Sequence, residues 1–307
     1  MDGKIVIGLV EKASGPYWEM LNLGAFAAGK LFNVDVVIRA PESSEDVNGE
    51  VQAMRELMSQ GVEGLAFVPV TPTPFLDVTK EALSSGLPLL TFDLDAPFDG
   101  RLAHVGSIGP CRLGEMAGEI LAELLEPGQK VAIQVGSRKS EGALAKLAGF
   151  TTVMQTRGIN IARIIYDDES PGQATTQLRE LLEEIPDLKG LYGTYGYHPG
   201  IQAKLVAEKG RQIHIVGFDT FPETLKGIQA GIIDATICVN EYYMGYYTVA
   251  LLTLMIKFGV DEALEFMGLK NKPIENRIVE VSPKIVRKAN LNEFENWMEA
   301  TIKPKKQ

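Results

Sequence analysis

The sequence predicts an α/β protein made of two doubly wound lobes, each a parallel sheet with helices on both faces. Short β-branched runs alternate with helical patterns along most of the 307 residues. Several of these runs are apolar on both faces, as strands of a covered parallel sheet are. The whole pattern also repeats once, and 307 residues are enough to form two cores.

Ten segments have the length and composition of strands: Lys4–Val10, Val34–Ile38, Gly64–Val68, Leu89–Phe92, Ala103–Val105, Lys130–Val135, Ile161–Tyr166, Gly190–Tyr192, Ile213–Phe218 and Ala235–Val239. Between them lie segments with helical periodicity, for instance Tyr17–Leu31, Val47–Gln60, Phe75–Ser85, Leu113–Leu125, Gly172–Glu184 and Pro199–Lys209. Such alternation indicates doubly wound sheets with right-handed crossovers.

The repeat is visible in the first helix of each half. One half carries Leu23-Gly24-Ala25-Phe26 after its first strand, and the other carries Leu147-Ala148-Gly149-Phe150. Later in each half a strand ends in a Phe-Asp pair, at Asp93 and at Asp219. Ligand crevices of open α/β sheets lie at the carboxyl ends of the strands. We therefore expect both aspartates to point into one cleft.

Composition excludes several classes of partner and cofactor. A net charge of −10 argues against nucleic acid, which needs a basic face. Two cysteines, Cys111 and Cys238, exclude a disulfide scaffold. No apolar stretch is long enough to span a membrane, and the three histidines and two cysteines lack metal-ligand spacing. No phosphate-binding glycine fingerprint follows Val10, so the sequence predicts neither a cofactor nor a metal.

The amino terminus lacks a charged segment followed by an apolar one, since Met1-Asp2-Gly3 leads directly into the first strand. Two interpretations stay open. The protein is cytoplasmic, or the chain is the mature part of an exported protein whose signal peptide has been removed.

Four fragments in a fixed order resemble the periplasmic sugar-binding proteins of the ribose-binding type, which serve ABC transporters and chemoreceptors. They are Gly15–Trp18, Gly86–Asp93 followed by Asp95–Pro97 and Arg101, Val216–Asp219, and Gly231–Ile237 followed by Tyr242 and Gly245. The resemblance extends from about Lys4 to Ala289.

The resemblance implies a type I periplasmic binding fold, in which two Rossmann-like lobes are joined by three chain crossings. The crossings are expected near Ser107, Val239–Asn240 and Asn276–Val279. The amino-terminal lobe would contain residues 1–107 and 240–276, and the carboxyl-terminal lobe residues 108–239 and 277–307. The family also implies a monomer that closes over a ligand held between the lobes.

The resemblance assigns ligand contacts to four residues. Tyr17 and Trp18 fall where the family places aromatic rings that stack on a sugar. Asp93 and Asp219 match the aspartates that accept hydrogen bonds from sugar hydroxyl groups. The alternatives are that the aromatic residues belong to the core and that the aspartates cap helices.

Other positions depart from the family pattern. Leu94 and Lys146 stand where relatives often have arginine, and Val239 replaces a glutamine beside Asn240. Glu11 replaces a small polar residue. The loop after the predicted Gly190–Tyr192 strand carries Tyr195, Tyr197 and His198, which predict a second aromatic wall. The predicted ligand-binding residues are Glu11, Tyr17, Trp18, Asp93, Lys146, Tyr195, Tyr197, His198, Asp219 and Asn240.

These residues predict an extracytoplasmic solute-binding protein that is not an enzyme. Its ligand is expected to be a monosaccharide or sugar-like polyol, delivered to an ABC transporter permease or a receptor. Carboxylates at Glu11, Asp93 and Asp219 leave open a ligand with a cationic group.

Three other functions stay open. A sensor module of a membrane receptor would share the ligand chemistry. The effector core of a LacI-type repressor shares the fold but would follow a DNA-binding segment. A glycoside hydrolase would use Asp93 and Asp219 as an acid and base. Against the hydrolase, the two aspartates would lie on separate lobes, and no neighbour is suited to raise either pKa.

Overall fold

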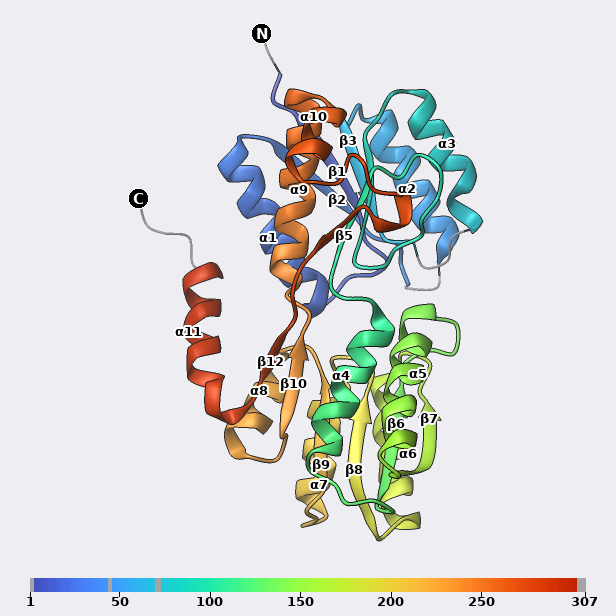
Figure 1. The fold of residues 1–307 in the computed structure, drawn as a ribbon, viewed down its shortest axis with the longest axis vertical. Coiled ribbons are helices and arrows are strands. Elements are labelled where there is room, and N and C mark those ends of the chain that lie inside the picture. The colour runs from blue at the N-terminus through green and yellow to red at the C-terminus, as the bar shows by residue number, and fades with distance from the viewer. Residues whose placement is uncertain (1–2, 44–45, 70–72, 303–307) are drawn as a thin grey trace. The chain divides into compact units, whose positions relative to one another are not determined.

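The computed structural model describes residues 3–43, 46–69 and 73–302 and divides into two compact units (Figure 1). The first unit comprises the described residues up to Ser107 together with Asn240–Ser282, and the second comprises Ile108–Val239 and the described residues from Pro283. The chain therefore passes from one unit to the other three times.

The first unit contains a six-stranded parallel sheet in the order β11-β5-β4-β3-β1-β2. Its strands are β1 (Val6–Val10), β2 (Asp35–Arg39), β3 (Gly64–Phe67), β4 (Leu89–Phe92), β5 (Ala103–Gly106) and β11 (Ile278–Glu280). Its helices are α1 (Pro16–Phe32), α2 (Val47–Ser59), α3 (Leu76–Ser84), α9 (Glu241–Phe258) and α10 (Val260–Phe266), with short 3₁₀ turns at Thr73–Phe75 and Ile274–Asn276.

The second unit repeats this topology with a sheet in the order β12-β10-β9-β8-β6-β7. Its strands are β6 (Lys130–Val135), β7 (Asn160–Tyr166), β8 (Leu188–Gly193), β9 (His214–Phe218), β10 (Ala235–Cys238) and β12 (Lys284–Val286). Its helices are α4 (Pro110–Ala122), α5 (Glu141–Thr156), α6 (Pro171–Glu184), α7 (His198–Glu208), α8 (Pro222–Ala230) and α11 (Leu291–Ile302), with a 3₁₀ turn at Lys288–Asn290. Only β12 runs antiparallel to its neighbour, β10.

Each unit has its own apolar core. In the first, buried residues of α2 and α3 pack on β1, β3 and β4 around Met54, Leu57 and Phe67. In the second, residues of α6, α7, α8 and α11 pack on the sheet around Leu178 and Ile215. The opposite faces are covered by the helix pairs α1–α9 and α4–α5.

Glycines bring the two helices of each pair close together. A Cβ atom added at Gly24 of α1 would lie 1.8 Å from the Tyr242 carbonyl oxygen of α9. In the second unit, a Cβ atom at Gly149 of α5 would lie 2.0 Å from the Cys111 carbonyl oxygen of α4. Gly24 and Gly149 are the glycines of the repeated sequence motif, so the repeat encodes a close helix–helix contact in both units.

The predicted α/β class with two parallel-dominated sheets is confirmed, and each predicted strand is present. The strands β11 and β12 were missed because each has only three residues. The last predicted crossing near Asn276–Val279 is too early. Because β11 pairs with β5 from Ile278 to Glu280, the first unit continues to Ser282.

Arg101 explains why the segment before β11 stays with the first unit. Its guanidinium group is completely buried and donates to the carbonyl oxygens of Ile274 and Arg277 at 2.5 and 3.2 Å. Its Nε also lies 3.3 Å from the Asp95 carboxylate. Arg101 therefore ties the loop after β4 to the chain that forms the sheet edge.

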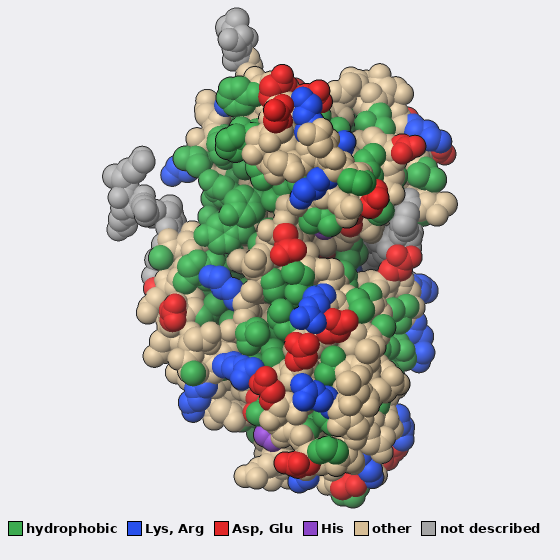
Figure 2. All heavy atoms as spheres, in the orientation of Figure 1, with side chains coloured by type: hydrophobic (Ala, Val, Ile, Leu, Met, Phe, Trp, Pro, Cys, Tyr) green, Lys and Arg blue, Asp and Glu red, His purple; other side chains and the backbone are tan. Residues whose placement is uncertain are grey.

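The first unit exposes several large hydrophobic side chains on α1, α9 and α10, and Figure 2 shows hydrophobic atoms gathered on this part of the surface. They include Leu23, Phe26 and Leu31 of α1, Tyr247 and Phe258 of α9, and Phe266 of α10. None of the helices within the described residues is both long and apolar enough to cross a membrane.

Gly149→Ala should destabilise the second unit, because the new methyl group would overlap a backbone carbonyl that cannot move independently of α4. We expect a loss of about 1–3 kcal/mol in the free energy of unfolding, measured by denaturant titration. Gly172→Ala is the matched control, since its Cβ would approach only the Ser170 hydroxyl, at 3.9 Å. Equal stability of Gly149→Ala and Gly172→Ala would contradict the close contact.

Candidate functional site

The carboxyl ends of β1 and β4 bring two acidic residues to the same edge of the first sheet. Glu11 directly follows β1, and Asp93 directly follows β4. Asp93 has a left-handed backbone with φ of 62°, and its N–H donates to the Val105 carbonyl oxygen of β5 at 3.1 Å. This hydrogen bond holds Asp93 at the strand end although the conformation is unfavourable for a residue with a side chain.

Tyr17 and Trp18 lie at the start of α1 and have different surroundings. The Tyr17 hydroxyl donates a hydrogen bond to the Asp93 carboxylate. Trp18 is only 5% exposed and packs edge-on against the Phe92 ring, 6.5 Å away. Tyr17 is half-buried, so of the two rings it offers more accessible surface to a ligand. A stacking role for Trp18 stays a prediction.

Glu11 is 2% exposed, and one of its carboxyl oxygens, Oε1, has no hydrogen-bond partner among the described residues. Burial raises its pKa to about 8, with a hydrogen bond from Asn22 lowering it and the charge of Asp93 raising it further. At neutral pH the Glu11 carboxyl group is mostly protonated.

Asp219 occupies the equivalent position in the second unit, directly after β9. Its φ is 64°, and its N–H donates to the Ile237 carbonyl oxygen of the next strand at 3.0 Å. Its side chain lies beside Gly196, where an added Cβ would be 2.6 Å from the Asp219 carboxylate. Gly196 thus leaves space for the carboxylate at the end of the sheet.

Neither aspartate caps a helix. The residue before α8 is Phe221, which makes no side-chain capping bond, and Asp219 lies two residues earlier. Residues 93–102, which follow β4, contain no helix. The capping interpretation is therefore excluded by the structure, and a structural role as a helix cap does not account for either carboxylate.

The aromatic residues after β8 form a hydrogen-bonded cluster with acidic residues after β7. The Tyr195 hydroxyl donates to Glu169 at 2.8 Å, and the Tyr197 hydroxyl donates to Asp167 at 2.5 Å. His198 Nε2 lies 2.8 Å from the second oxygen of Asp167. The rings of Tyr197 and His198 are 4.4 Å apart, so the three aromatic residues form one wall.

His198 is a structural member of this wall. Its side chain and that of Asp167 are completely buried. Its Nδ1 accepts the Tyr195 backbone N–H at 3.1 Å, so the ring proton is on Nε2 and is donated to Asp167. Burial lowers the pKa of His198, which keeps the ring neutral. The ring thus positions Tyr195 and Tyr197.

Lys146 and Asn240, the remaining predicted residues, lie in different units. In the second unit, the Lys146 ammonium group donates to the Thr194 carbonyl oxygen at 3.3 Å and lies 4.1 Å from the centre of the Phe218 ring. In the first unit, Asn240 precedes α9 and donates to the Ser282 carbonyl oxygen at 3.4 Å. Lys146 thus lies beside the ring of Phe218, the residue before Asp219. Asn240 joins two chain segments at the boundary of its unit.

Sequence reasoning missed three buried or half-buried acidic residues. Asp167 and Glu169 follow β7. Acidic residues directly after a strand could have predicted that these two side chains belong to the site. Glu50 is 1% exposed, and neither of its carboxyl oxygens has a hydrogen-bond partner among the described residues. The helical spacing of Glu50 with Val47, Met54 and Leu57 places its carboxyl group on the apolar face of α2, which was the available signal.

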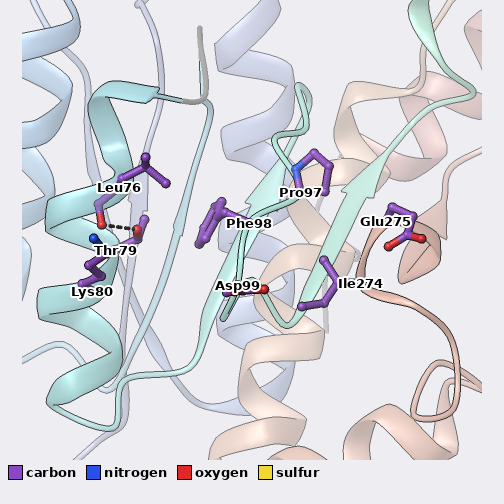
Figure 3. Close-up of a pocket in the computed structure, with 8 residues that line it drawn as sticks. All are labelled: Leu76, Thr79, Lys80, Pro97, Phe98, Asp99, Ile274 and Glu275. Carbon is purple, nitrogen blue, oxygen red and sulfur yellow. Dashed lines mark hydrogen bonds between the residues drawn. The ribbon is translucent and has the colours of Figure 1, made fainter.

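A surface pocket of about 630 Å³ lies elsewhere in the first unit (Figure 3). Its lining comes from α3, from the loop after β4 and from the turn before β11: Leu76, Thr79, Lys80, Pro97, Phe98, Asp99, Ile274 and Glu275. Lys80, Asp99 and Glu275 are exposed, and none of the predicted ligand residues lines the pocket. The pocket is therefore separate from the predicted ligand residues at the strand ends. These form two half-sites: Glu11, Tyr17 and Asp93 in the first unit, and Lys146, Asp219 and the aromatic wall in the second.

Metal binding has no support among the residues that the structure describes, where no cluster of three or more histidine, cysteine or acidic side chains could hold an ion. Cys111 and Cys238 are free thiols.

Two matching α/β units, each with a left-handed aspartate and tyrosine side chains at the carboxyl edge of its sheet, define a class of two-lobed binding proteins. The model of the periplasmic binding protein domain family matches residues 7–259. The chain belongs to this family, as the four sequence fragments predicted.

The chain is similar to a D-ribose/D-allose-binding protein of Pseudomonas aeruginosa, with 24% identity over 66% of this chain and 66% of the relative. It is also 24% identical to the D-allose-binding periplasmic protein of Escherichia coli, over 84% of this chain and 88% of the relative. The match thus spans slightly less than two thirds of the Pseudomonas protein.

A solved structure with a similar fold is an ABC transporter solute-binding protein from Burkholderia graminis in complex with D-arabinose. The two sequences are 25% identical, and the match covers 95% of this chain and 98% of the Burkholderia chain, with a TM-score of 0.83. All three proteins are named as binding proteins.

Glu50 should make stability depend on pH. Its pKa is about 8 in the folded protein, raised by burial, against an ordinary value of 4.5. Between these values the folded state keeps a proton that the unfolded state releases, so stability falls as pH rises from about 4.5 to 8. Glu50→Gln should therefore increase the free energy of unfolding at pH 8 by about 3 kcal/mol and change it little at pH 5.

Denaturant titration at both pH values measures this effect. Glu56→Gln, on the exposed face of the same helix, is the control and should leave stability unchanged at either pH. A Glu50→Gln protein that is no more stable than the parent at pH 8 would contradict a buried, protonated Glu50.

Proposed function

We propose that this protein binds a monosaccharide or a sugar-like polyol and delivers it to an ABC importer. The observation that carries the proposal is the pair Asp93 and Asp219, held in the same left-handed conformation at equivalent strand ends. Carboxylates accept strong hydrogen bonds from hydroxyl groups. The sugars named for the similar proteins, ribose, allose and arabinose, support this ligand class.

In this proposal the ligand is held between two lobes that correspond to the two units. It docks first through Tyr17, Trp18 and Asp93 of the first unit. Its later bonds to Asp219, Lys146 and the aromatic wall of the second unit stabilise a closed form over an open one. Asn240 lies at the chain crossing that accommodates closure.

Membership of the family also supports a proposal for the location, oligomeric state and partner of the protein. We propose that the protein acts outside the cytoplasm as a monomer and that a membrane permease recognises its closed form. A receptor sensor module is the second candidate, since it would use the same ligand chemistry. A repressor core is disfavoured by the net charge of −10.

The hydrolase alternative gains one observation, because a protonated Glu11 near the charged Asp93 resembles an acid and base pair. We nevertheless propose binding without catalysis, in line with the family. Incubation with nitrophenyl glycosides should release no nitrophenol under conditions where the matching sugar binds. Turnover that is lost in Glu11→Gln would instead establish a hydrolase.

Asp93→Ala should weaken sugar binding at least about tenfold, equivalent to roughly 1.4 kcal/mol, because the ligand loses a charged acceptor. A thermal-shift screen of pentoses, hexoses and polyols first identifies a binder, and calorimetry then measures its affinity. Asp99→Ala, in the same loop but exposed, is the matched control and should bind normally. Unchanged affinity in a folded Asp93→Ala protein would contradict the proposed site.

A further inference from the structure

The first unit presents a buried carboxyl group whose hydrogen bonding is incomplete. Glu11 is 2% exposed, and its Oε1 has no partner among the described residues. A buried polar atom left without a partner destabilises the protein by about 1–3 kcal/mol, so its persistence points to a ligand group that completes it. The position of Glu11 at the carboxyl end of β1, in the same sheet as β4 and Asp93, places this atom where α/β sheets bind ligands.

The tyrosine hydroxyl groups at both half-sites already donate their protons to carboxylates. Tyr17 donates to Asp93, Tyr195 donates to Glu169, and Tyr197 donates to Asp167. A hydroxyl group has one proton and two lone pairs, so each of these oxygens can offer a ligand only acceptor capacity. The tyrosine oxygens of the second unit therefore add hydrogen-bond acceptors to those that Glu11 and Asp93 provide in the first unit.

Cationic side chains offset the excess of hydrogen-bond acceptors and negative charge at these half-sites only in part. Lys146 uses one donor on the Thr194 carbonyl oxygen and lies over the Phe218 ring. Arg101 is buried and directs its guanidinium group to Asp95 and two backbone carbonyl oxygens. Lys12, which follows Glu11, lowers the pKa of Glu50. The half-sites thus favour a ligand with more donors than acceptors.

We infer that the ligand carries an ammonium group, as an amino sugar or amino polyol does, and that Glu11 and Asp93 bind it. The inference rests on the proposed function and narrows its ligand class. A hydroxyl group both donates and accepts, whereas an ammonium group donates three hydrogen bonds, accepts none and brings a positive charge. It would donate a hydrogen bond to Glu11 Oε1 and offset one of the two negative charges of the ionised pair. The remaining hydroxyl groups of the ligand would meet Lys146, Asp219 and the aromatic wall.

Matched pairs of ligands test this inference by calorimetry. D-glucosamine is compared with D-glucose at pH 6, and 1-amino-1-deoxyglucitol with glucitol at pH 7. We expect the amine of at least one pair to bind at least tenfold more tightly than its neutral partner. Binding at pH 7 should also release up to about one proton, because an adjacent ammonium group ionises Glu11. Titrations in buffers of different ionisation enthalpy measure that release.

Glu11→Gln supplies the second test. It should abolish proton release and lower the affinity for the amine at least tenfold, while Glu56→Gln, an exposed change of the same kind, should keep both at the parent values. If only neutral partners bind, the ammonium inference fails and the sugar-binding proposal stands. If no member of any pair binds, the inference fails, and a negative sugar screen would then also remove the proposed function. Tight amine binding without proton release would contradict the role of Glu11.

Discussion

The backbone hydrogen bond at the end of β4, and its counterpart at the end of β9, is the constraint on which the candidate site depends. In each case the aspartate N–H donates to a carbonyl oxygen of the adjacent strand, while φ is 62° at Asp93 and 64° at Asp219. A left-handed conformation is unfavourable for most residues with a side chain, and aspartate adopts it more readily than most. The same conformation recurs at the equivalent strand end of each unit.

Neighbouring residues hydrogen-bond to the Asp93 carboxylate and leave space for the Asp219 carboxylate. Tyr17 at the start of α1 donates to Asp93, and Gly196 leaves room for Asp219. The buried pair Asp167 and His198 fixes the aromatic wall after β8. The glycine contacts allow the helix pairs α1–α9 and α4–α5 to pack closely over the other face of each sheet. The two aspartates are therefore held in place by neighbouring side chains and by the packing of each unit.

The sequence was sufficient to predict what lies in short, local patterns. The two Phe-Asp pairs and the two glycine motifs each occupy a few consecutive residues. The structure has the aspartates at the ends of β4 and β9 and the glycines at close helix–helix contacts. The Asp167–His198 contact joins residues 31 positions apart, so no local pattern contains it. The boundary at Ser282 depended on β11, a three-residue strand that forms because it pairs with β5. Glu50 was predictable from helical spacing, whereas its lack of a partner required the packed structure.

We propose that one sugar-like ligand is bound by Asp93 and Asp219 together. A crystal structure of the protein with a ligand found by screening tests this most directly. We predict one bound molecule whose polar groups lie within hydrogen-bonding distance of both Asp93 and Asp219. A ligand bound by only one unit, or bound in the pocket beside α3, would contradict the account.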